Sequence, residues 1–198
     1  MKHKHLFIFC MAAVVAWVLG TCAFIYFWPH LFYNAARRAV VERGLGIKAG
    51  GIPVNTLYAM PALASPSLSK SVWVRTGNRD TLYTVDVLEL GKGPEILHVP
   101  DMSGRYYSIE FVDPWLDVFA DVGRRTTGTK AGDYLIAGPG FHGAAPSGMT
   151  RISAPDNSVL LIGRVLVESE SDLPAAYDLE KQIQLTPLSH RQTKPEPG

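Results

Sequence analysis

The chain has few cysteines, and its water-soluble part has none. Cys10 and Cys22 are the only two, and both lie inside an apolar run near the amino terminus. Disulfide bonds, thiol nucleophiles and cysteine-based zinc sites are therefore excluded for the rest of the chain. We predict no metal ion and no cofactor, and residue spacing alone indicates no catalytic residue.

The chain also lacks an excess of charge of either sign. Without Lys2 and Lys4, the 19 Lys and Arg fall to 17, against 18 Asp and Glu. This balance gives no electrostatic reason to expect nucleic acid as a partner, because protein surfaces that bind the negatively charged phosphate backbone are strongly basic. A G-x-S-x-G motif is missing as well, so serine-hydrolase chemistry is not supported.

Charge is missing altogether from residues 6–28, which form the longest apolar run of the chain. At 1.5 Å per residue, a helix of this length covers about 34 Å. That is enough to cross a hydrocarbon core of about 30 Å. The sequence therefore predicts a single transmembrane helix over residues 6–28, preceded by a short cytoplasmic tip over residues 1–5.

The direction of insertion follows from the start of the chain. Lys2 and Lys4 run straight into the apolar segment, as in export signals, although basic residues beyond the segment nearly balance them. We expect the amino terminus in the cytoplasm and the soluble domain on the other side. Two alternatives are cleavage after Ala23 and lipid attachment at Cys22. Retention of the helix explains the apolar residues 24–28 better than either alternative.

Residues 29–49 continue with helical character and carry several basic side chains. Arg37, Arg38 and Arg43 alternate with small apolar residues, and the pattern stops at the glycines that begin with Gly44. The segment is predicted as a basic juxtamembrane helix and linker. It either lies on anionic headgroups or acts as a solvated spacer.

From residue 50 the apolar period changes to two, which is typical of strands. The clearest case is Arg105–Val112, where Tyr107, Ile109 and Phe111 are expected to face the core, and Tyr106, Ser108 and Glu110 solvent or a cleft. In a second strand, Thr81–Val87, we expect one buried face. Further strands are predicted at Val72–Arg75, Glu95–Val99, Tyr134–Ala137, Met149–Ser153 and Ser158–Leu166.

This spacing of strands and turns favours a β-sandwich or barrel over a parallel sheet with crossover helices. One short helix is predicted near the carboxyl terminus, starting at Ser171 or Asp172. Residues 50–188 are therefore expected to form one mainly β domain. Residues 189–198, which carry charges and two prolines, are predicted to be a disordered tail.

Three patterns that suggest chemistry are weak in this context. Residues 138–143 fit G-x-G-x-x-G, but the sequence after them predicts another turn and strand in place of the helix that a dinucleotide site requires. His98, Asp101 and His142 could supply metal ligands, yet their spacing is not specific. Asp113, Asp117 and Asp121 would form an acidic ladder only on a helix, which Pro114 disfavours.

The segment 122–129 is the most suggestive one for binding. Arg124 and Arg125 stand beside Thr126 and Thr127 between glycines, and two guanidinium groups can hold a carboxylate or phosphate. The structural alternative is that one arginine pairs with a strand carboxylate such as Asp113 while the hydroxyl groups shape a turn.

Several separated motifs resemble one known family. They are NRDTLY at 78–83, VPD at 99–101, GRYYS at 104–108, GRRTTG at 123–128, AGDY at 131–134, GPG at 138–140 and LTPL at 185–188. In order and spacing they resemble the bacterial domain-of-unknown-function family 1254, here in a membrane-anchored short form. The resemblance implies an immunoglobulin-like β-sandwich in a bacterial protein. Together with the apolar run and the basic start of the chain, it leads us to expect a single-pass protein of the bacterial inner membrane with a periplasmic domain.

The resemblance implies no established activity, so two functional classes stay open. The first is a binding or assembly module whose partner is a separate protein of the family 1214 type, because longer relatives continue into such a domain. The second is an envelope enzyme that uses Asp80, Arg105, Tyr106 or Arg124 on a small polar or lipidic substrate. The candidate binding residues are Asn78, Asp80, Tyr83, Arg105, Tyr106, Asp113, Arg124, Arg125, Thr126 and Thr127.

Overall fold

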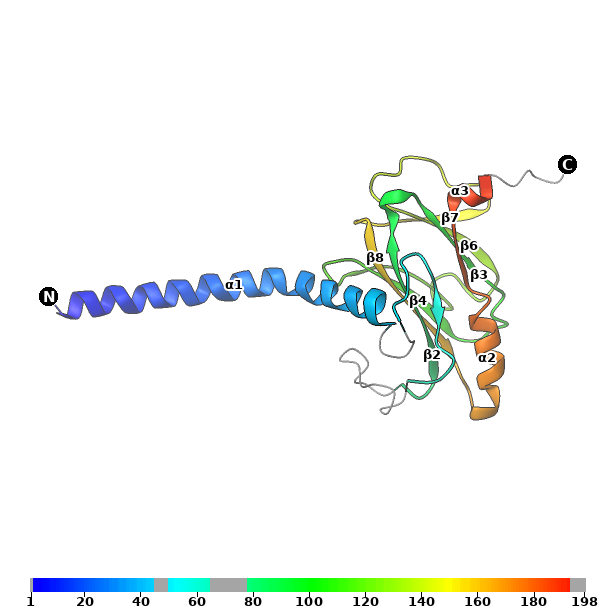
Figure 1. Cartoon of the computed structure of the whole chain (residues 1–198), viewed down its shortest axis with the longest axis horizontal. Helices are drawn as coiled ribbons and strands as arrows, with labels where there is room; N and C mark the ends of the chain where they lie inside the picture. The colour runs from blue at the N-terminus through cyan, green and yellow to red at the C-terminus, as the bar shows by residue number, and fades with distance from the viewer. Residues whose placement is uncertain (1, 45–49, 65–77, 193–198) are drawn as a thin grey trace.

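The computed structural model describes residues 2–44, 50–64 and 78–192, and its main body consists of two facing β-sheets (Figure 1). Sheet A has the order β1 (Tyr58–Ala59), β2 (Thr81–Glu89), β8 (Ser158–Leu166), β4 (Tyr107–Val112) and β5 (Val118–Gly123). Sheet B has the order β7 (Met149–Ser153), β6 (Gly132–Ala137), β3 (Glu95–Val99) and β9 (Gln184–Pro187). Among the strands in the described residues, only β6 and β7 pair in parallel. The expected mainly β, sandwich-like architecture is confirmed.

The sequence predicted the central strands better than the edge strands. β3, β7 and β8 have the predicted bounds, and β2, β4 and β6 differ only at an end. The three strands that were missed, β1, β5 and β9, all lie at sheet edges. Edge strands bury less side-chain surface, so their apolar alternation is weak. The strand expected at residues 72–75 lies outside the described residues.

The main core fills the space between the sheets. Tyr107, Ile109 and Phe111 of β4 point into it, as predicted, together with Leu97 and Leu161 from the two central strands β3 and β8. The same cluster includes Leu82, Leu88, Val99, Val122, Tyr134, Ile136, Val159 and Val165. Burial of this much apolar surface is the dominant stabilising contribution to such a domain.

The prediction of one buried face on β2 is wrong, because both faces of this strand are covered. Val85 and Val87 pack outward against the first helix, whereas Thr84 and Asp86 point inward and are fully enclosed. Strand β2 therefore lies between two layers, although its sequence has the alternation of a half-buried strand.

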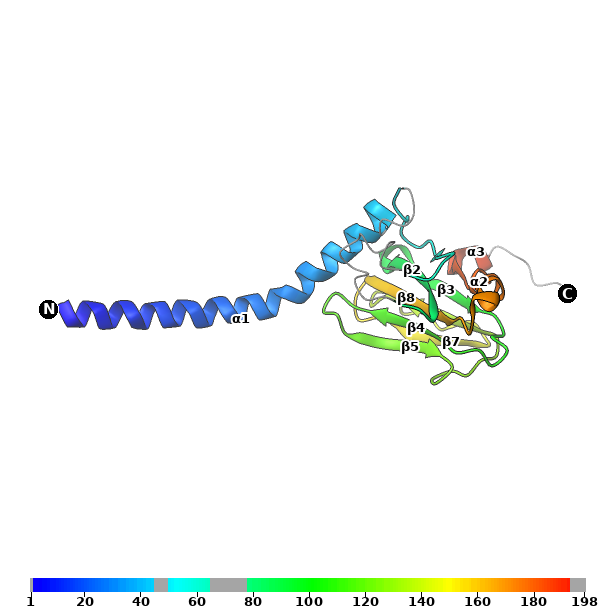
Figure 2. The same ribbon diagram turned by 90° about the horizontal axis from the view of Figure 1, so that it is seen from below.

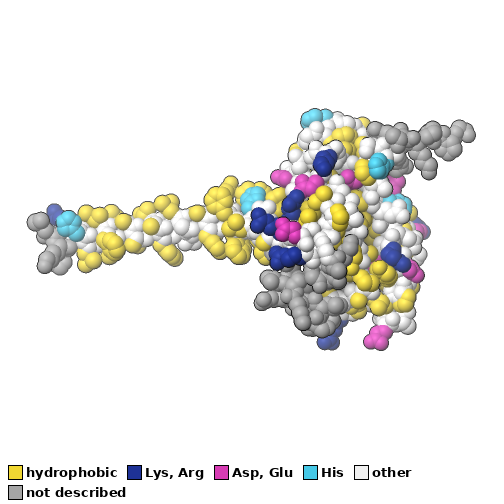
Figure 3. Space-filling view, in the orientation of Figure 1, with side chains coloured by type: hydrophobic (Ala, Val, Ile, Leu, Met, Phe, Trp, Pro, Cys, Tyr) yellow, Lys and Arg dark blue, Asp and Glu magenta, His cyan; other side chains and the backbone are white. Residues whose placement is uncertain are grey.

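Helix α1 (Lys2–Arg43) is continuous and projects far beyond the sheets (Figure 1). Its first part carries exposed apolar side chains on all sides (Figure 3). Among the described residues it is the one helix long and apolar enough to cross a membrane. Figure 2 shows that α1 bends, and Pro29 lies within it. A bend is expected there because proline removes a helical hydrogen bond and clashes with the preceding turn.

The last part of α1 packs on the domain, which differs from both arrangements expected for residues 29–49. Tyr33 is only 2% exposed, and Ala39 and Val40 are buried against β2. The Arg37 guanidinium donates two hydrogen bonds to one carboxylate oxygen of Glu89, at 2.7 and 3.0 Å. The apolar side of this segment faces β2, so the segment holds the sandwich against the end of α1.

Two short helices complete the fold. Helix α2 (Leu173–Glu180) begins within two residues of the predicted start and buries Ala176 and Glu180. Helix α3 (Leu188–Gln192) covers the beginning of the segment expected to be a disordered tail, so that expectation is wrong for residues 189–192. Short 3₁₀ turns occupy Leu90–Lys92 and Glu170–Asp172.

Candidate functional site

Strand pairing gathers most of the predicted binding residues at one end of sheet A. Thr81 pairs with Leu166, Tyr107 with Val165, and Ser108 with Gly123. The segments beside these pairs are residues 78–80, 105–106 and 124–128, which we call the distal loops. They lie at the opposite end of sheet A from Glu89 and Ser158, the residues that α1 contacts. The distal loops therefore lie away from the side on which α1 leaves the domain.

Asn78 organises the start of β2. Its amide nitrogen donates to the carbonyl and hydroxyl oxygens of Thr81 at 2.7 and 2.6 Å. Its amide oxygen accepts hydrogen bonds from the backbone N–H groups of Asp80 and Thr81. Asp80 has an exposed side chain, while its carbonyl accepts a hydrogen bond from Val167. Asn78 is thus a capping residue, and Asp80 is the accessible carboxylate of this turn.

Arg105 joins β4 to the segment before α2. Its guanidinium forms a two-pronged ion pair with Asp172, at 2.5 and 2.7 Å, and also donates to the Leu166 carbonyl. Hydrogen bonds from Arg105 hold the pKa of the Asp172 carboxyl down at about 2. Because its donors already have partners inside the protein, Arg105 positions α2 and is not available as an anion clamp.

The turn at residues 123–128 is held by its own hydroxyl groups. Thr126 and Thr127 both donate to the Gly123 carbonyl, and the Thr127 hydroxyl also accepts the Gly123 N–H. A Cβ at Gly123 would lie 2.7 Å from the Tyr107 carbonyl oxygen, so only glycine fits there. The expectation that the hydroxyls shape a turn is confirmed.

The expected pairing of an arginine of this turn with Asp113 is wrong. Asp113 lies beyond the other end of β4, where its carboxylate accepts the N–H groups of Trp115 and Asp117. Arg125 instead places its guanidinium 5.9 Å from the centre of the Tyr106 ring. The structure therefore separates Asp113 from the other candidates. It leaves Arg124 and Arg125 exposed in the distal loops.

A polar strip adjoins the distal loops on the outer face of sheet A. It consists of Tyr83, Tyr106, Glu110, Asp121, Arg125 and Arg164. Arg164 donates to Glu110 at 2.6 Å and lies over the Tyr83 ring. Asp121 is next to Glu110 across the strand pair, and burial and the Glu110 charge raise the pKa of its carboxyl.

Sequence reasoning missed Asp121 and Arg164, because only the strand register brings them beside Glu110 and Tyr83. Cross-strand charge pairs of this kind have no local sequence signal. Alternation on β4 did place Glu110 on the face away from the core, and that part of the prediction agrees with its half-exposed position.

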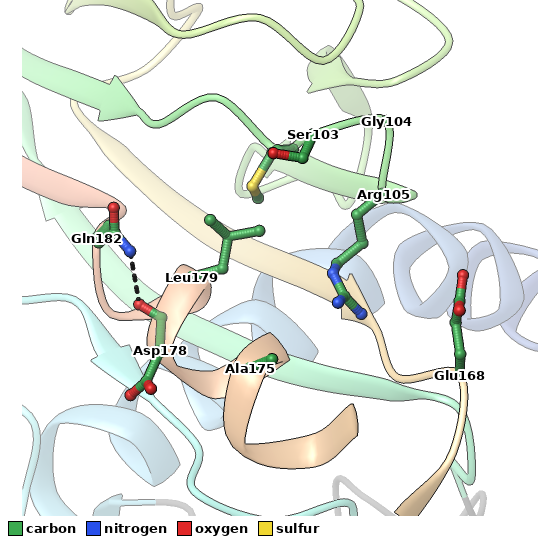
Figure 4. A pocket seen from close by; sticks show the side chains of 9 residues that line it. Ser103, Gly104, Arg105, Glu168, Ala175, Asp178, Leu179 and Gln182 are labelled. Carbon is green, nitrogen blue, oxygen red and sulfur yellow. Dashed lines mark hydrogen bonds between the residues drawn. The ribbon is translucent and has the colours of Figure 1, made fainter. Parts of the chain in front are cut away.

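A cavity of about 580 Å³ opens beside α2 (Figure 4). Arg105 and Glu168 lie on one side, and Asp178, Leu179 and Gln182 line it from α2 and the turn that follows. Of the four residues proposed for an enzyme, only Arg105 lines this cavity, and it is already paired with Asp172. Asp80, Tyr106 and Arg124 are not among its lining residues.

Three buried carboxyl groups lie away from the predicted site. Asp86 points inward from β2, Glu95 lies on β3, and Glu180 ends α2. Thr84 donates to Glu180 at 2.6 Å, and Asn55 donates to Glu95 at 2.9 Å. Burial raises the pKa of all three carboxyls to about 7. One oxygen of each has no hydrogen-bond partner among the described residues.

Two of the three residues weighed as metal ligands, His98 and Asp101, have protein partners. His98 Nδ1 lies 2.7 Å from an oxygen of Asp133, and Asp101 pairs with Lys130 at 3.0 Å. Among the described residues, no group of three or more His, Cys, Asp or Glu side chains is placed to hold an ion. Residues 138–143 form the expected turn, and β7 follows without a helix between.

Several solved structures are similar to this chain, among them one from Vibrio parahaemolyticus and one from Burkholderia cenocepacia. The VPA0106 protein from Vibrio parahaemolyticus is 30% identical, with a TM-score of 0.56 over 61% of this chain and 31% of that protein. An uncharacterized protein from Burkholderia cenocepacia is 13% identical, with a TM-score of 0.41, covering 69% of this chain and 36% of that one. The chain thus spans about a third of the length of these proteins.

Among curated proteins none matches this chain. The family comparison, in contrast, covers most of the domain. The model for the protein of unknown function DUF1254 matches residues 54–187, from the segment before β1 to the end of β9. This range contains the motifs on which the family resemblance rests, except for Leu188, the last residue of the final motif. The chain therefore belongs to the DUF1254 family.

Proposed function

We propose that the chain is a single-pass, membrane-anchored envelope protein whose β-sandwich binds a partner through the distal loops and the polar strip. The membrane is the bacterial inner membrane, and the sandwich lies in the periplasm. The immunoglobulin-like class implied by the family resemblance is part of the same proposal.

The observation that carries the proposal is the rigid mounting of the sandwich on α1. The apolar part of α1 is exposed on all sides, whereas residues 33–40 are fixed to sheet A by burial and by the Arg37–Glu89 pair. A membrane around residues 6–28 would therefore hold the distal loops at the far end of the domain, accessible to other proteins. The exposed side chains of Arg124 and Arg125 suit the polar rim of such an interface.

The partner that we propose is a protein of the family 1214 type. The match covers 31% of the 30% identical Vibrio protein, so that protein continues well beyond the matching part. A separate, membrane-confined partner would meet this domain at a high effective concentration. Even a modest interface would then suffice.

The enzyme alternative has less support from the geometry. It requires its four residues around one substrate, but Arg105 is paired inside the fold and Tyr106 packs under Arg125 on the polar strip. An acid–base pair acts on a substrate only when both groups reach the same atoms. A binding role does not require these residues to reach the same substrate atoms.

Site-specific photo-cross-linking in native membranes tests the proposed function. A photoreactive residue replaces Arg125 in the distal loops, and the control replaces exposed Lys92 at the other end of sheet A. We expect a family 1214 type protein to be trapped from position 125 and not from position 92. Equal yields at the two positions, or no protein adduct at 125, would contradict the proposal.

A further inference from the structure

Two strongly exposed large apolar side chains lie within residues 113–118, the loop between β4 and β5 taken together with Val118, the first residue of β5. Trp115 keeps 41% of its surface exposed, and Val118 keeps 55%. Among the described residues after α1, no other large apolar side chain is exposed to this extent. Single exposed apolar residues are common on soluble proteins, so what matters is where this pair lies.

The loop, residues 113–118, touches the apolar part of α1. The ring of Trp115 lies 5.1 Å from that of Tyr26 and 4.0 Å from that of His30, between ring centres. Tyr26 lies near the end of the uncharged run that closes with Trp28. The loop is therefore at the level where a membrane around residues 6–28 would end.

The loop is held in this outward position. The Asp113 carboxylate accepts the N–H groups of Trp115 and Asp117 at 2.8 and 3.0 Å, and the Asp113 N–H donates to the Asp117 carbonyl. Leu116, at the tip, has φ +68°, a left-handed conformation that these bonds maintain. Because the last part of α1 is fixed to sheet A as well, neither side of the contact is free to turn away.

We propose that residues 113–118 dock on the surface of the lipid bilayer that α1 crosses, with Trp115 and Val118 at headgroup level. Indole rings favour this level because they combine an apolar body with one polar N–H. The exposed Asp117 carboxylate limits insertion, since a charge is costly deeper in the bilayer. The lipid is the occupant because the loop is continuous with the exposed apolar surface of α1.

The docking rests on the proposed membrane anchoring, so the experiment reports on both. The full chain, with Cys10→Ser and Cys22→Ser, carries an environment-sensitive fluorophore on Val118→Cys. It is reconstituted into vesicles of phosphatidylethanolamine and phosphatidylglycerol. The matched control carries the fluorophore on Lys130→Cys, an exposed position beyond the distal loops. A further sample carries it on the native Cys22, within the apolar run.

We expect lipids with a quencher in the headgroup region to reduce the emission from position 118 by about twofold or more relative to position 130, since only the former reaches the interface. Quenching by aqueous iodide should instead be stronger at position 130 than at position 118. If lipid quenchers act on Cys22 but not on position 118, the docking is overturned and the anchoring stands. If they act on neither, both are overturned. Should Val118→Cys fail to fold, Trp115→Cys gives the same readout from the same loop.

Discussion

Gly51 lies directly against the end of α1. A Cβ at this position would be 1.7 Å from the Val41 carbonyl oxygen, and the Ile52 N–H donates to the Val40 carbonyl beside it. We predict that Gly51→Ala separates the end of α1 from β2 and lowers the free energy of unfolding by about 1–3 kcal/mol, because the backbone has to move. Gly140→Ala, where a Cβ meets nothing within 4 Å, is the control and should be nearly neutral. Equal effects of the two changes in chemical denaturation would argue against the tight contact.

Phe111 and Glu110 are neighbours on β4 with opposite environments. Phe111 is fully buried in the main core, whereas Glu110 is half-exposed and pairs with Arg164 on the outer face. Phe111→Ala should lower the free energy of unfolding by about 3–5 kcal/mol. Glu110→Ala should cost less than about 1 kcal/mol, because exposed ion pairs contribute little. Similar losses in the two variants, measured by urea denaturation, would show that the two faces are wrongly assigned.

At the scale of residues, the sequence predicts apolar positions much better than polar ones. Alternation on β4 identifies Tyr107, Ile109 and Phe111 because burial of an apolar face is a local pattern. Asp86 and Glu95 are buried although their type favours the surface. The burial of Glu95 is explained by Asn55, which is far away in sequence and donates a hydrogen bond to the Glu95 carboxylate. Partners that lie far away in sequence are the reason why these positions could not be predicted.

Helix α2 ends in one of three buried carboxyl groups that make the stability of the domain depend on pH. Its last residue, Glu180, is buried and accepts a hydrogen bond from Thr84 of β2, and its pKa is raised to about 7, like those of Asp86 and Glu95. In the unfolded chain these carboxyls titrate near 4. The folded state therefore binds more protons than the unfolded state between these values, and stability falls as the pH rises from about 4 to about 7.

We predict that the unfolding midpoint of the full chain in detergent is higher at pH 5 than at pH 8. Glu180→Gln should reduce the difference, because it removes one of the three groups that lose their proton. Asp156→Asn changes an exposed carboxyl and should leave the difference between the two midpoints unchanged. All three proteins carry the same histidines, so the histidine contribution is common to them. A midpoint that rises from pH 5 to pH 8 in the wild-type protein would show that these carboxyls are not protonated inside the fold.

Among the secondary-structure elements, the sequence predicts every strand in the middle of a sheet but only one of the four edge strands, β7. β8 pairs with β2 along its whole length and with β4 over Leu160–Val165, and its bounds were predicted without error. β5 and β9 each pair on one side only, and they expose many side chains. The candidate site depends on the same pairing. Strand register brings the distal loops together at one end of sheet A. The sequence motifs show the order of these segments along the chain but not their arrangement in space.

For the whole molecule, the main difference between expectation and structure is the role of residues 29–43. From their basic residues we expected a helix on the lipid headgroups or a solvated spacer. In the structure, the small apolar residues of this segment pack against β2. In the structure, the last part of α1 is joined to the domain by the Arg37–Glu89 pair and the Tyr33–Ser158 hydrogen bond. These contacts lie at the end of sheet A opposite the distal loops.

The proposed topology places α1 across the membrane and the sandwich in the periplasm. Two fusions after Gly198 distinguish it from the inverted topology: a phosphatase that folds only outside the cytoplasm and a fluorescent protein that matures only inside it. We expect an active phosphatase fusion and a dark fluorescent fusion, because a basic start of the chain favours an amino terminus in the cytoplasm. An inactive phosphatase together with a bright fluorescent fusion would show that the sandwich lies in the cytoplasm.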